Sequence, residues 1–108
     1  MDEQNELIQV AMNIIMNAGN ARTKTDKALD YLLEFEIDEA KLLIKEARED
    51  ITKAHIAQTK IIQEEASGKR YDSCLLFTHA QDTLMTIMSE VNLSEKMILL
   101  FEAIEKKH

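Results

Sequence analysis

The sequence of 108 residues has no proline, no tryptophan, two glycines and one cysteine. Domains built from many short strands need frequent turn residues and aromatic side chains, so these shortages argue against a β-sandwich or a β-barrel. A single cysteine cannot form an internal disulfide, and Cys74 lies in an apolar run, which predicts a buried thiol in a reducing compartment. We expect one all-α domain that spans residues 1–108.

Basic residues are also in the minority, since 13 Lys and Arg face 20 Asp and Glu and the formal net charge is −7. Such a surface repels phosphate backbones and anionic lipid, which argues against nucleic acid or a membrane surface as a partner. The segment Met1–Glu6 is acidic where a signal peptide would be basic, and no apolar stretch approaches the ~20 residues of a membrane span. We expect a cytoplasmic protein without direct membrane insertion.

Apolar residues recur three and four positions apart in three long segments, which is the pattern of amphipathic helices. The expected helices cover about residues 5–34, 38–66 and 73–106. Short loops would make neighbouring helices antiparallel. The expected architecture is an antiparallel three-helix bundle of spectrin-repeat type. A rod this slender would gain from burying more surface in an oligomer.

Small and aliphatic residues mark the expected buried side of each helix. In the first helix they are Leu7, Ala11, Ile14, Ala18, Ala21, Ala28 and Leu32. In the second they are Ala40, Leu43, Ala47, Ile51, Ala54, Gln58, Ile61 and Ile62. In the third they are Leu76, Ala80, Leu84, Ile87, Val91 and Ile98.

The expected helix ends rest on a few residues. Asp38 and Glu39 suit the first turn of the second helix through its dipole, and Gly68 is the residue type that commonly follows a helix end. Asp72 or Ser73 can cap the third helix. The acidic run from Glu46 to Asp50, which is interrupted by Arg48, is typical of a solvated face.

The third helix also has a second face, nearly opposite its core stripe. It consists of Leu75, Asp82, Thr86, Ser89, Leu93 and Leu100, with His79 at its edge. A helix with two partly apolar faces needs two sets of neighbours, and other copies of the chain could supply the second set.

His79 opens the run His79-Ala80-Gln81-Asp82 and lies off the core stripe. Neutral imidazole is nucleophilic through nitrogen, and the phosphoramidate that it forms can pass its phosphoryl group onward. Taken alone, a helical histidine is usually a surface or core-edge residue, and Asp82 alone would be a solvated carboxylate. Other segments of the sequence are needed to distinguish a phosphorylated histidine from an ordinary surface residue.

Three segments carry a resemblance that extends over nearly the whole chain: Asn17–Arg22, Lys53–Thr59 and Leu75–Thr86. In order and separation they resemble the lactose/cellobiose-type enzyme IIA component of the bacterial phosphoenolpyruvate-dependent sugar phosphotransferase system. The sequence departs from the usual pattern of that family at Thr83, where a second histidine is frequent, at Asn20, and at Phe35-Glu36, where a glycine-containing turn is usual.

The resemblance implies a phosphotransferase component with His79 as its phosphohistidine. His79 would accept a phosphoryl group through Nε2 from phospho-HPr and pass it to a cysteine of the IIB component. The IIC membrane component would then transport and phosphorylate a disaccharide, whose identity the sequence leaves open.

The resemblance also implies a homotrimer in which Asp82 meets its two symmetry copies around one divalent metal ion. Three crowded carboxylates demand a cation or protons, because each pair at ~5 Å would repel by roughly 3 kcal/mol at an effective dielectric constant of 20. Oxygen ligands favour a hard ion such as Mg²⁺.

The remaining histidines and the methionines have simpler interpretations. His55 lies beside the buried stripe of the second helix and is expected to be a core-edge residue that could border the site. His108 is expected to be a solvated tail residue. Five methionines are expected to provide adaptable packing: Met12, Met16, Met85, Met88 and Met97. Any of them that are exposed could serve a surface that binds HPr and IIB in turn.

Two other functions stay open at this point. A histidine phosphotransfer domain of a two-component relay is also helical, but such domains usually place a lysine and a glycine shortly after the histidine in a four-helix bundle. The other alternative is a non-catalytic oligomeric bundle or a carboxylate metal store. Di-iron bundles need repeated Glu-x-x-His pairs, which this sequence does not contain in the required arrangement.

Overall fold

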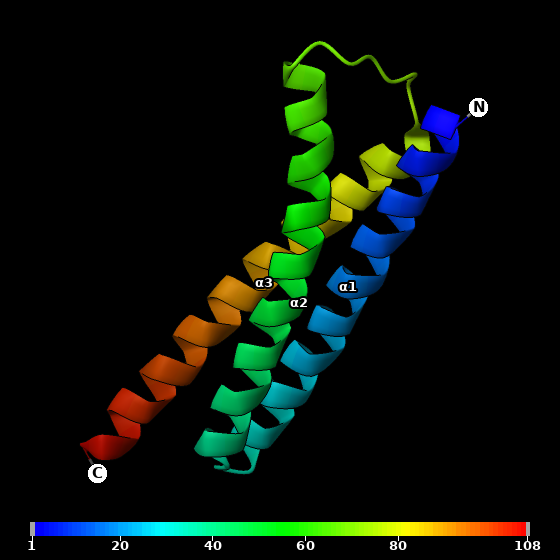
Figure 1. Ribbon diagram of the computed structural model, residues 1–108. Helices are drawn as coiled ribbons and strands as arrows, with labels where there is room; N and C mark the ends of the chain where they lie inside the picture. Colours follow the sequence, from blue (N-terminus) through cyan, green and yellow to red (C-terminus); the bar gives the residue numbers. More distant parts are fainter. Residues whose placement is uncertain (1, 108) are drawn as a thin grey trace.

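The computed structural model describes residues 2–107 of the chain, and the side chains of residues 4–107. This part of the chain folds into three helices: α1 (Asp2–Leu33), α2 (Ile37–Ala66) and α3 (Leu75–Lys106). They form a rod with extents of 60 × 21 × 17 Å, in which α1 and α3 run in one direction and α2 in the other (Figure 1). The expected all-α three-helix bundle is confirmed.

The helix ends agree with expectation except at the starts of α1 and α3, and α1 begins at Asp2 rather than at about residue 5. Asp38 and Glu39 lie in the first turn of α2, and Gly68 follows the end of α2 with φ of 107°, which glycine adopts without strain. Neither Asp72 nor Ser73 caps α3. The N-cap position is Cys74, whose extended backbone precedes the helix without a side-chain capping hydrogen bond, and α3 therefore begins later than expected.

The turn between α1 and α2 contains no glycine, and Phe35 takes the left-handed conformation there with φ of 61°. This conformation is unfavourable for a bulky residue. The Glu36 backbone N–H donates to the carbonyl oxygen of Tyr31 at 2.9 Å and closes the turn. The Phe35 ring contacts the ring of Phe101 on α3, with centroids 5.3 Å apart.

The expected core is largely confirmed. The buried hydrophobic residues of α1 are Leu7, Ala11, Ile14, Ala18, Ala21 and Ala28. In α2 the prediction of Ile62 is wrong, because this side chain is exposed and Ile44 is buried instead, while Leu43 and Gln58 are only half-buried. In α3 the stripe from Ala80 to Ile98 is buried as expected, whereas Leu76 is half-buried and Phe77 takes the deeper position.

Ion pairs connect every pair of helices near the middle of the rod. Arg22 of α1 contacts Glu90 of α3 at 2.8 Å, and Arg48 of α2 contacts Glu95 of α3 at 2.7 Å. The hydrogen bond from each arginine holds the pKa of its partner carboxyl below the usual range. These contacts show which edge of each helix faces which neighbour.

The third of these pairs is partly buried, which corrects the expectation of a solvated acidic run. Asp50 is only 5% exposed, and Nζ of Lys24 lies 2.7 Å from its carboxylate. The hydrogen bond to Asp50 raises the pKa of Lys24. Thr25 is buried too, and its hydroxyl donates to the carbonyl oxygen of Ala21 at 2.7 Å.

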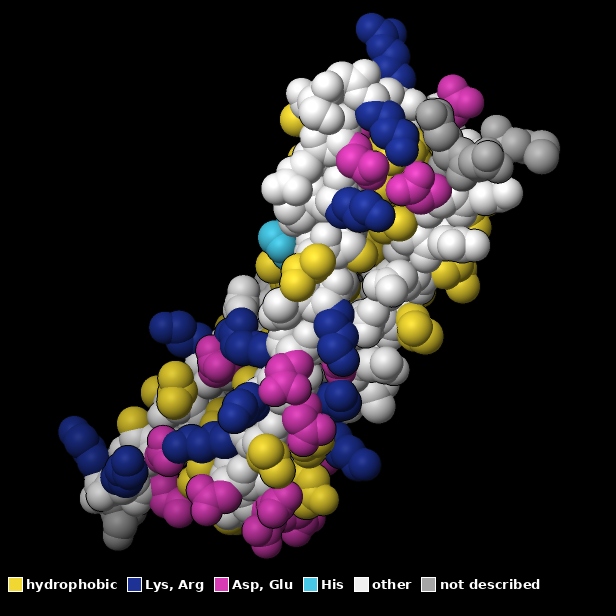
Figure 2. Space-filling model, in the orientation of Figure 1, with side chains coloured by type: hydrophobic (Ala, Val, Ile, Leu, Met, Phe, Trp, Pro, Cys, Tyr) yellow, Lys and Arg dark blue, Asp and Glu magenta, His cyan; other side chains and the backbone are white. Residues whose placement is uncertain are grey.

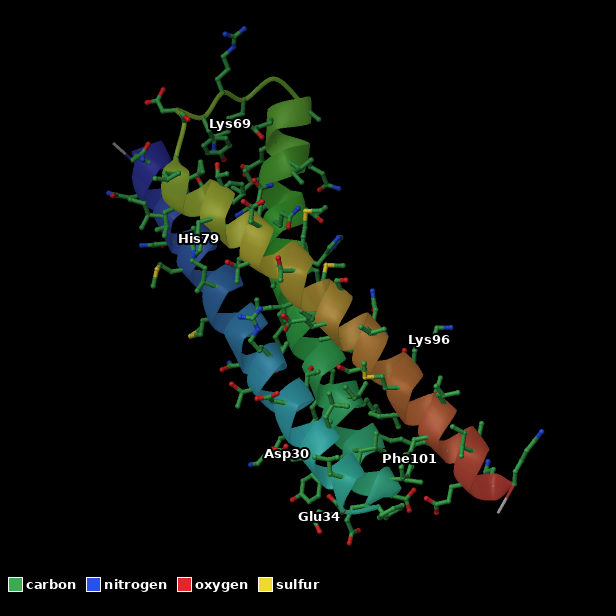
Figure 3. All side chains as sticks on the ribbon, turned by 180° about the vertical axis from the view of Figure 1, so that it is seen from behind. Asp30, Glu34, Lys69, His79, Lys96 and Phe101 are labelled. Carbon is green, nitrogen blue, oxygen red and sulfur yellow. The ribbon has the colours of Figure 1, made fainter. Side chains whose placement is uncertain are left out.

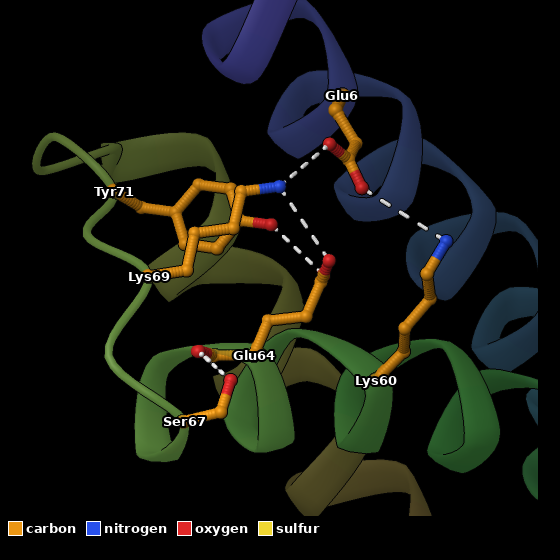
Figure 4. Close-up of polar contacts among 6 residues, drawn as sticks. All are labelled: Glu6, Lys60, Glu64, Ser67, Lys69 and Tyr71. Carbon is orange, nitrogen blue, oxygen red and sulfur yellow. Dashed lines mark hydrogen bonds and ion pairs between the residues drawn. The ribbon is translucent and has the colours of Figure 1, made fainter.

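A polar network ties the α2–α3 loop to the first two helices (Figure 4). The Tyr71 hydroxyl donates to Glu64 at 2.8 Å, and Lys69 lies between Glu64 and Glu6 at 3.5 and 3.4 Å. The hydrogen bond from Tyr71 lowers the pKa of Glu64, while the contacts with Tyr71 and Glu6 raise the pKa of Lys69. The network therefore fixes the loop that leads into α3.

None of the helices described here combines the length and the hydropathy that crossing a bilayer requires.

Candidate functional site

His79 lies in the second turn of α3 and is exposed to solvent. Figure 3 shows it toward the end of the rod where α1 and α3 begin. The Thr83 hydroxyl donates to the backbone carbonyl of His79 at 2.8 Å. Within residues 4–107, no side chain forms a hydrogen bond to the imidazole of His79, so neither ring nitrogen is engaged within the subunit.

The side of α3 on which His79 lies follows from the ion pairs. Glu90 comes about three helical turns after His79, so both residues lie on the same edge of α3. Because Glu90 pairs with Arg22, this edge faces α1. His79 therefore borders the groove between α3 and α1.

The exposed face of α3 has a regular spacing that continues the second face expected from the sequence. Its members alternate four and three residues apart along most of the helix: Leu75, His79, Asp82, Thr86, Ser89, Leu93, Met97, Leu100 and Ile104. We call this set the α3 seam. Its five apolar side chains are between 44% and 85% exposed. A repeat of 3.5 residues is the pattern by which parallel helices pack into coiled coils. The seam also includes Met97 and Ile104, which the sequence analysis missed.

Asp82 lies on the seam one turn after His79 and is exposed. Among residues 2–107 of a single chain, no group of three or more His, Cys, Asp and Glu side chains is arranged to hold a metal ion. One chain thus offers a single carboxylate at this place. Its oxygen atoms suit a hard divalent ion, and its position on the seam suits a site shared between copies.

His55 does not lie at the core edge as expected, because its side chain is exposed. Its Nδ1 is 3.4 Å from the hydroxyl of Thr59. Arg48 precedes His55 by about two turns on the same edge of α2, and it pairs with Glu95 of α3. His55 therefore borders the groove between α2 and α3, and the fold does not bring it to His79 within one subunit.

Four of the five methionines contradict the expectation of packing, since only Met88 packs against the core. Met12 and Met16 are exposed on α1, and they line a shallow hollow of about 520 Å³ together with Ile8 and Ile15. Counting back from the Arg22–Glu90 pair along two parallel helices places Met12 near the height of His79. An apolar surface thus lies on α1 near the height of His79.

The other singled-out residues add little to the site. Gln81 is half-buried, Asn20 is exposed, and Cys74 is a half-buried free thiol rather than a fully buried one. A side chain at Gly19 would meet no heavy atom within 4 Å, so no close approach within the subunit requires glycine there. His108 lies outside the described residues.

Comparison with known proteins gives the site its context. Residues 9–102 match the family model described as "PTS system, Lactose/Cellobiose specific IIA subunit". The chain belongs to this family. IIA components are phosphotransfer proteins, so membership assigns the chain a transferase role in a sugar phosphotransferase system and decides against a two-component relay domain and a purely structural bundle.

Relatives and solved structures agree over nearly the whole chain. The lactose-specific EIIA component of Lacticaseibacillus casei is 35% identical, with 98% of this chain and 95% of the relative covered. The crystal structure of PtcA from S. mutans is 38% identical with a TM-score of 0.88, covering 91% of this chain and 96% of that one. The IIA(Chitobiose)–HPr complex of Escherichia coli is 32% identical with a TM-score of 0.78, covering 92% and 96%.

Proposed function

We propose that the chain is a cytoplasmic phosphocarrier that accepts a phosphoryl group on Nε2 of His79 from phospho-HPr and donates it to a cysteine of the IIB component. The observation that carries this proposal is an exposed imidazole that no described side chain of its own subunit engages, in a member of the IIA family. A carrier needs such a nucleophile, because both partners must reach the same nitrogen in turn.

The chemistry is two successive displacements at phosphorus. In the first, the lone pair of neutral His79 Nε2 forms a P–N bond while the bond from phosphorus to HPr breaks. In the second, the thiolate of the IIB cysteine forms a P–S bond while the P–N bond to His79 breaks, and the imidazole becomes neutral again. Positioning for in-line transfer supplies most of the catalysis in both steps.

The apolar surface on α1 fits the need for two partners. Ile8, Met12 and Met16 are all exposed on α1, near the height of His79 along the rod. Methionine side chains are flexible and adapt to surfaces of different shape. HPr as a partner is also supported by the Escherichia coli relative, whose solved structure is a complex with HPr.

The proposal includes a homotrimer formed along the α3 seam. Leu75, Leu93, Met97, Leu100 and Ile104 are exposed in one subunit, and their burial against two copies would offset the small core of a three-helix rod. His79 lies on the α1 edge of this seam, which leaves its ring beside the groove between helices rather than on the axis.

In that trimer, the three Asp82 carboxylates would hold one divalent cation, with Mg²⁺ favoured by the oxygen donors. The ion would neutralise carboxylates that otherwise repel one another and would thereby stabilise the assembly. Every chemical step above uses the imidazole of His79, so the ion's role is structural.

The test is a complete relay with purified proteins. Phosphoenolpyruvate, enzyme I and HPr should place an acid-labile, alkali-stable phosphoryl group on the wild-type chain, and addition of IIB should remove it. The H79A variant should take up no label. The matched control is H55A, which should behave as wild type because His55 lies in another groove. Equal labelling of H79A and wild type would overturn the proposal.

The sugar is set by components other than this one. Relatives of 34–35% identity serve systems named for lactose, lichenan and N,N'-diacetylchitobiose. Similarity at this level therefore does not select one of these sugars.

A further inference from the structure

The turn between α1 and α2 presents two large apolar side chains to solvent. Leu33 is 79% exposed and Phe35 is 68% exposed, although leucine and phenylalanine are usually buried. Phe35 also retains an unfavourable left-handed backbone, with φ of 61°. We call Leu33 and Phe35 the distal pair.

The distal pair lies far from the proposed phosphoryl site. Phe35 contacts Phe101, and Phe101 follows His79 along α3 by a length of about 33 Å at 1.5 Å per residue. Neither member belongs to the α3 seam, so a trimer formed by the seam does not by itself cover them. A partner on the distal pair would leave His79 accessible.

Acidic groups surround the distal pair. Residues 30–39 include five carboxylates and no basic residue: Asp30, Glu34, Glu36, Asp38 and Glu39. Figure 2 shows acidic side chains gathered with exposed hydrophobic ones at this end of the rod. A hollow of about 380 Å³ lies there, with apolar Phe35 and Ile37 in its lining. The rest of its lining is charged: Glu36, Asp38, Glu102, Glu105 and Lys106.

The charge of this surface selects the kind of partner. An anionic lipid surface would be repelled by the carboxylates, whereas a protein segment with lysine or arginine would be attracted. Among the proteins of such a system, HPr and IIB must meet at His79. Enzyme I acts on HPr rather than on this chain, which leaves the membrane component, and cytoplasmic loops of membrane proteins carry an excess of Lys and Arg.

We propose that the distal pair and its acidic rim form a docking surface for a basic cytoplasmic loop of the IIC membrane component. This inference rests on the proposed function, because that function supplies the partner. The aliphatic stem of a Lys or Arg side chain would pack on Phe35 and Ile37, and its charged end would lie among the rim carboxylates. Docking there would hold the carrier near the transporter while His79 remains free for HPr and IIB.

The experiment measures binding of the full-length chain to the detergent-solubilised IIC component of its own system. The test variant is L33S/F35G. Glycine removes the ring together with its contact with Phe101, but it relieves the left-handed strain and therefore keeps the backbone of the turn. The matched control is L42S, because Leu42 is an exposed leucine of α2 outside the distal pair. We expect at least tenfold weaker binding for L33S/F35G, wild-type binding for L42S, and a steep decrease with salt.

Other results would overturn the inference. Wild type that fails to bind IIC, or L33S/F35G that binds equally well, contradicts it directly. Binding to protein-free anionic vesicles would assign the surface to lipid, and dissociation of L33S/F35G into monomers would assign it to another copy. Labelling of His79 by phospho-HPr is measured in parallel. Unchanged labelling in all variants separates failure of this inference from failure of the proposed function.

Discussion

His79 and Asp82 lie one helical turn apart on α3, both exposed, at neighbouring positions of the α3 seam. The histidine lies on the edge of the seam that faces α1, and the aspartate lies within it. In the proposed function, this spacing would let one helix present a nucleophile to partner proteins and a carboxylate to its own copies.

The seam predicts that L100E dissociates the trimer. Leu100 is exposed in one subunit, and three glutamates at the axis would repel by roughly 3 kcal/mol per pair at ~5 Å. Sedimentation equilibrium should show monomers with unchanged helical circular dichroism. L42E is the control, because Leu42 lies off the seam and should leave the trimer intact. A trimeric L100E protein would show that another surface holds the copies together.

Asp82 predicts a metal-dependent stability that one substitution removes. Chelation with EDTA should lower the melting temperature of the wild-type trimer, because three carboxylates then face one another without a cation. D82N lacks these charges and should melt at the same temperature with and without EDTA. Differential scanning calorimetry makes the comparison. Wild type that is indifferent to EDTA would argue against the shared metal site.

The Lys24–Asp50 pair predicts a stability effect away from the site. D50A removes the carboxylate that accepts the hydrogen bond from Lys24 at 2.7 Å in a largely buried position. The free energy of unfolding should fall by about 1–3 kcal/mol, because the polar partners lose their hydrogen bond. Urea unfolding measures the change. The control is E49A, at the exposed neighbouring position, whose free energy of unfolding should stay within about 0.5 kcal/mol of wild type. An equal loss of stability in E49A would show that the effect of D50A does not come from the Lys24–Asp50 pair.

Acid should destabilise the bundle through the carboxyls that pair between helices. Arg48 lowers the pKa of Glu95 in the folded chain. The stability from this pair is thus complete above the unfolded pKa of about 4.3 and is lost as the pH falls through the lower folded value. Between about pH 6 and pH 3, the melting temperature should fall less steeply for E95Q than for wild type. If the melting temperatures of E95Q and wild type fall equally as the pH falls, Glu95 does not contribute to the acid sensitivity.

Much of the fold could be predicted from the sequence because hydrophobic spacing determines which side of a long helix is buried. The stripe from Ala80 to Ile98 was correct for this reason. At the start of α3 the spacing was less decisive, since Leu76 and Phe77 are adjacent apolar residues and both could face inward. Cys74 is the N-cap of α3 and forms no side-chain capping hydrogen bond. The residue at which α3 begins therefore depends on how the loop packs, which sequence spacing does not describe.

Contacts between helices were the part that sequence spacing could not supply. Asp50 appeared to belong to a solvated run because its partner, Lys24, lies on another helix. A motif and its resemblance to a family single out His79 and Asp82, and the roles of both residues stay predictions. Of the nine seam residues, Met97 and Ile104 were not predicted, and Met97 was instead expected to provide adaptable packing.

The most direct test of the central claim locates phosphorus on the wild-type chain. After phosphorylation by phosphoenolpyruvate, enzyme I and HPr, the ³¹P and ¹⁵N nuclear magnetic resonance spectra should show a single phosphohistidine, bonded through Nε2 of His79. A phosphoryl group on His55, on Cys74 or on any other residue would contradict the account.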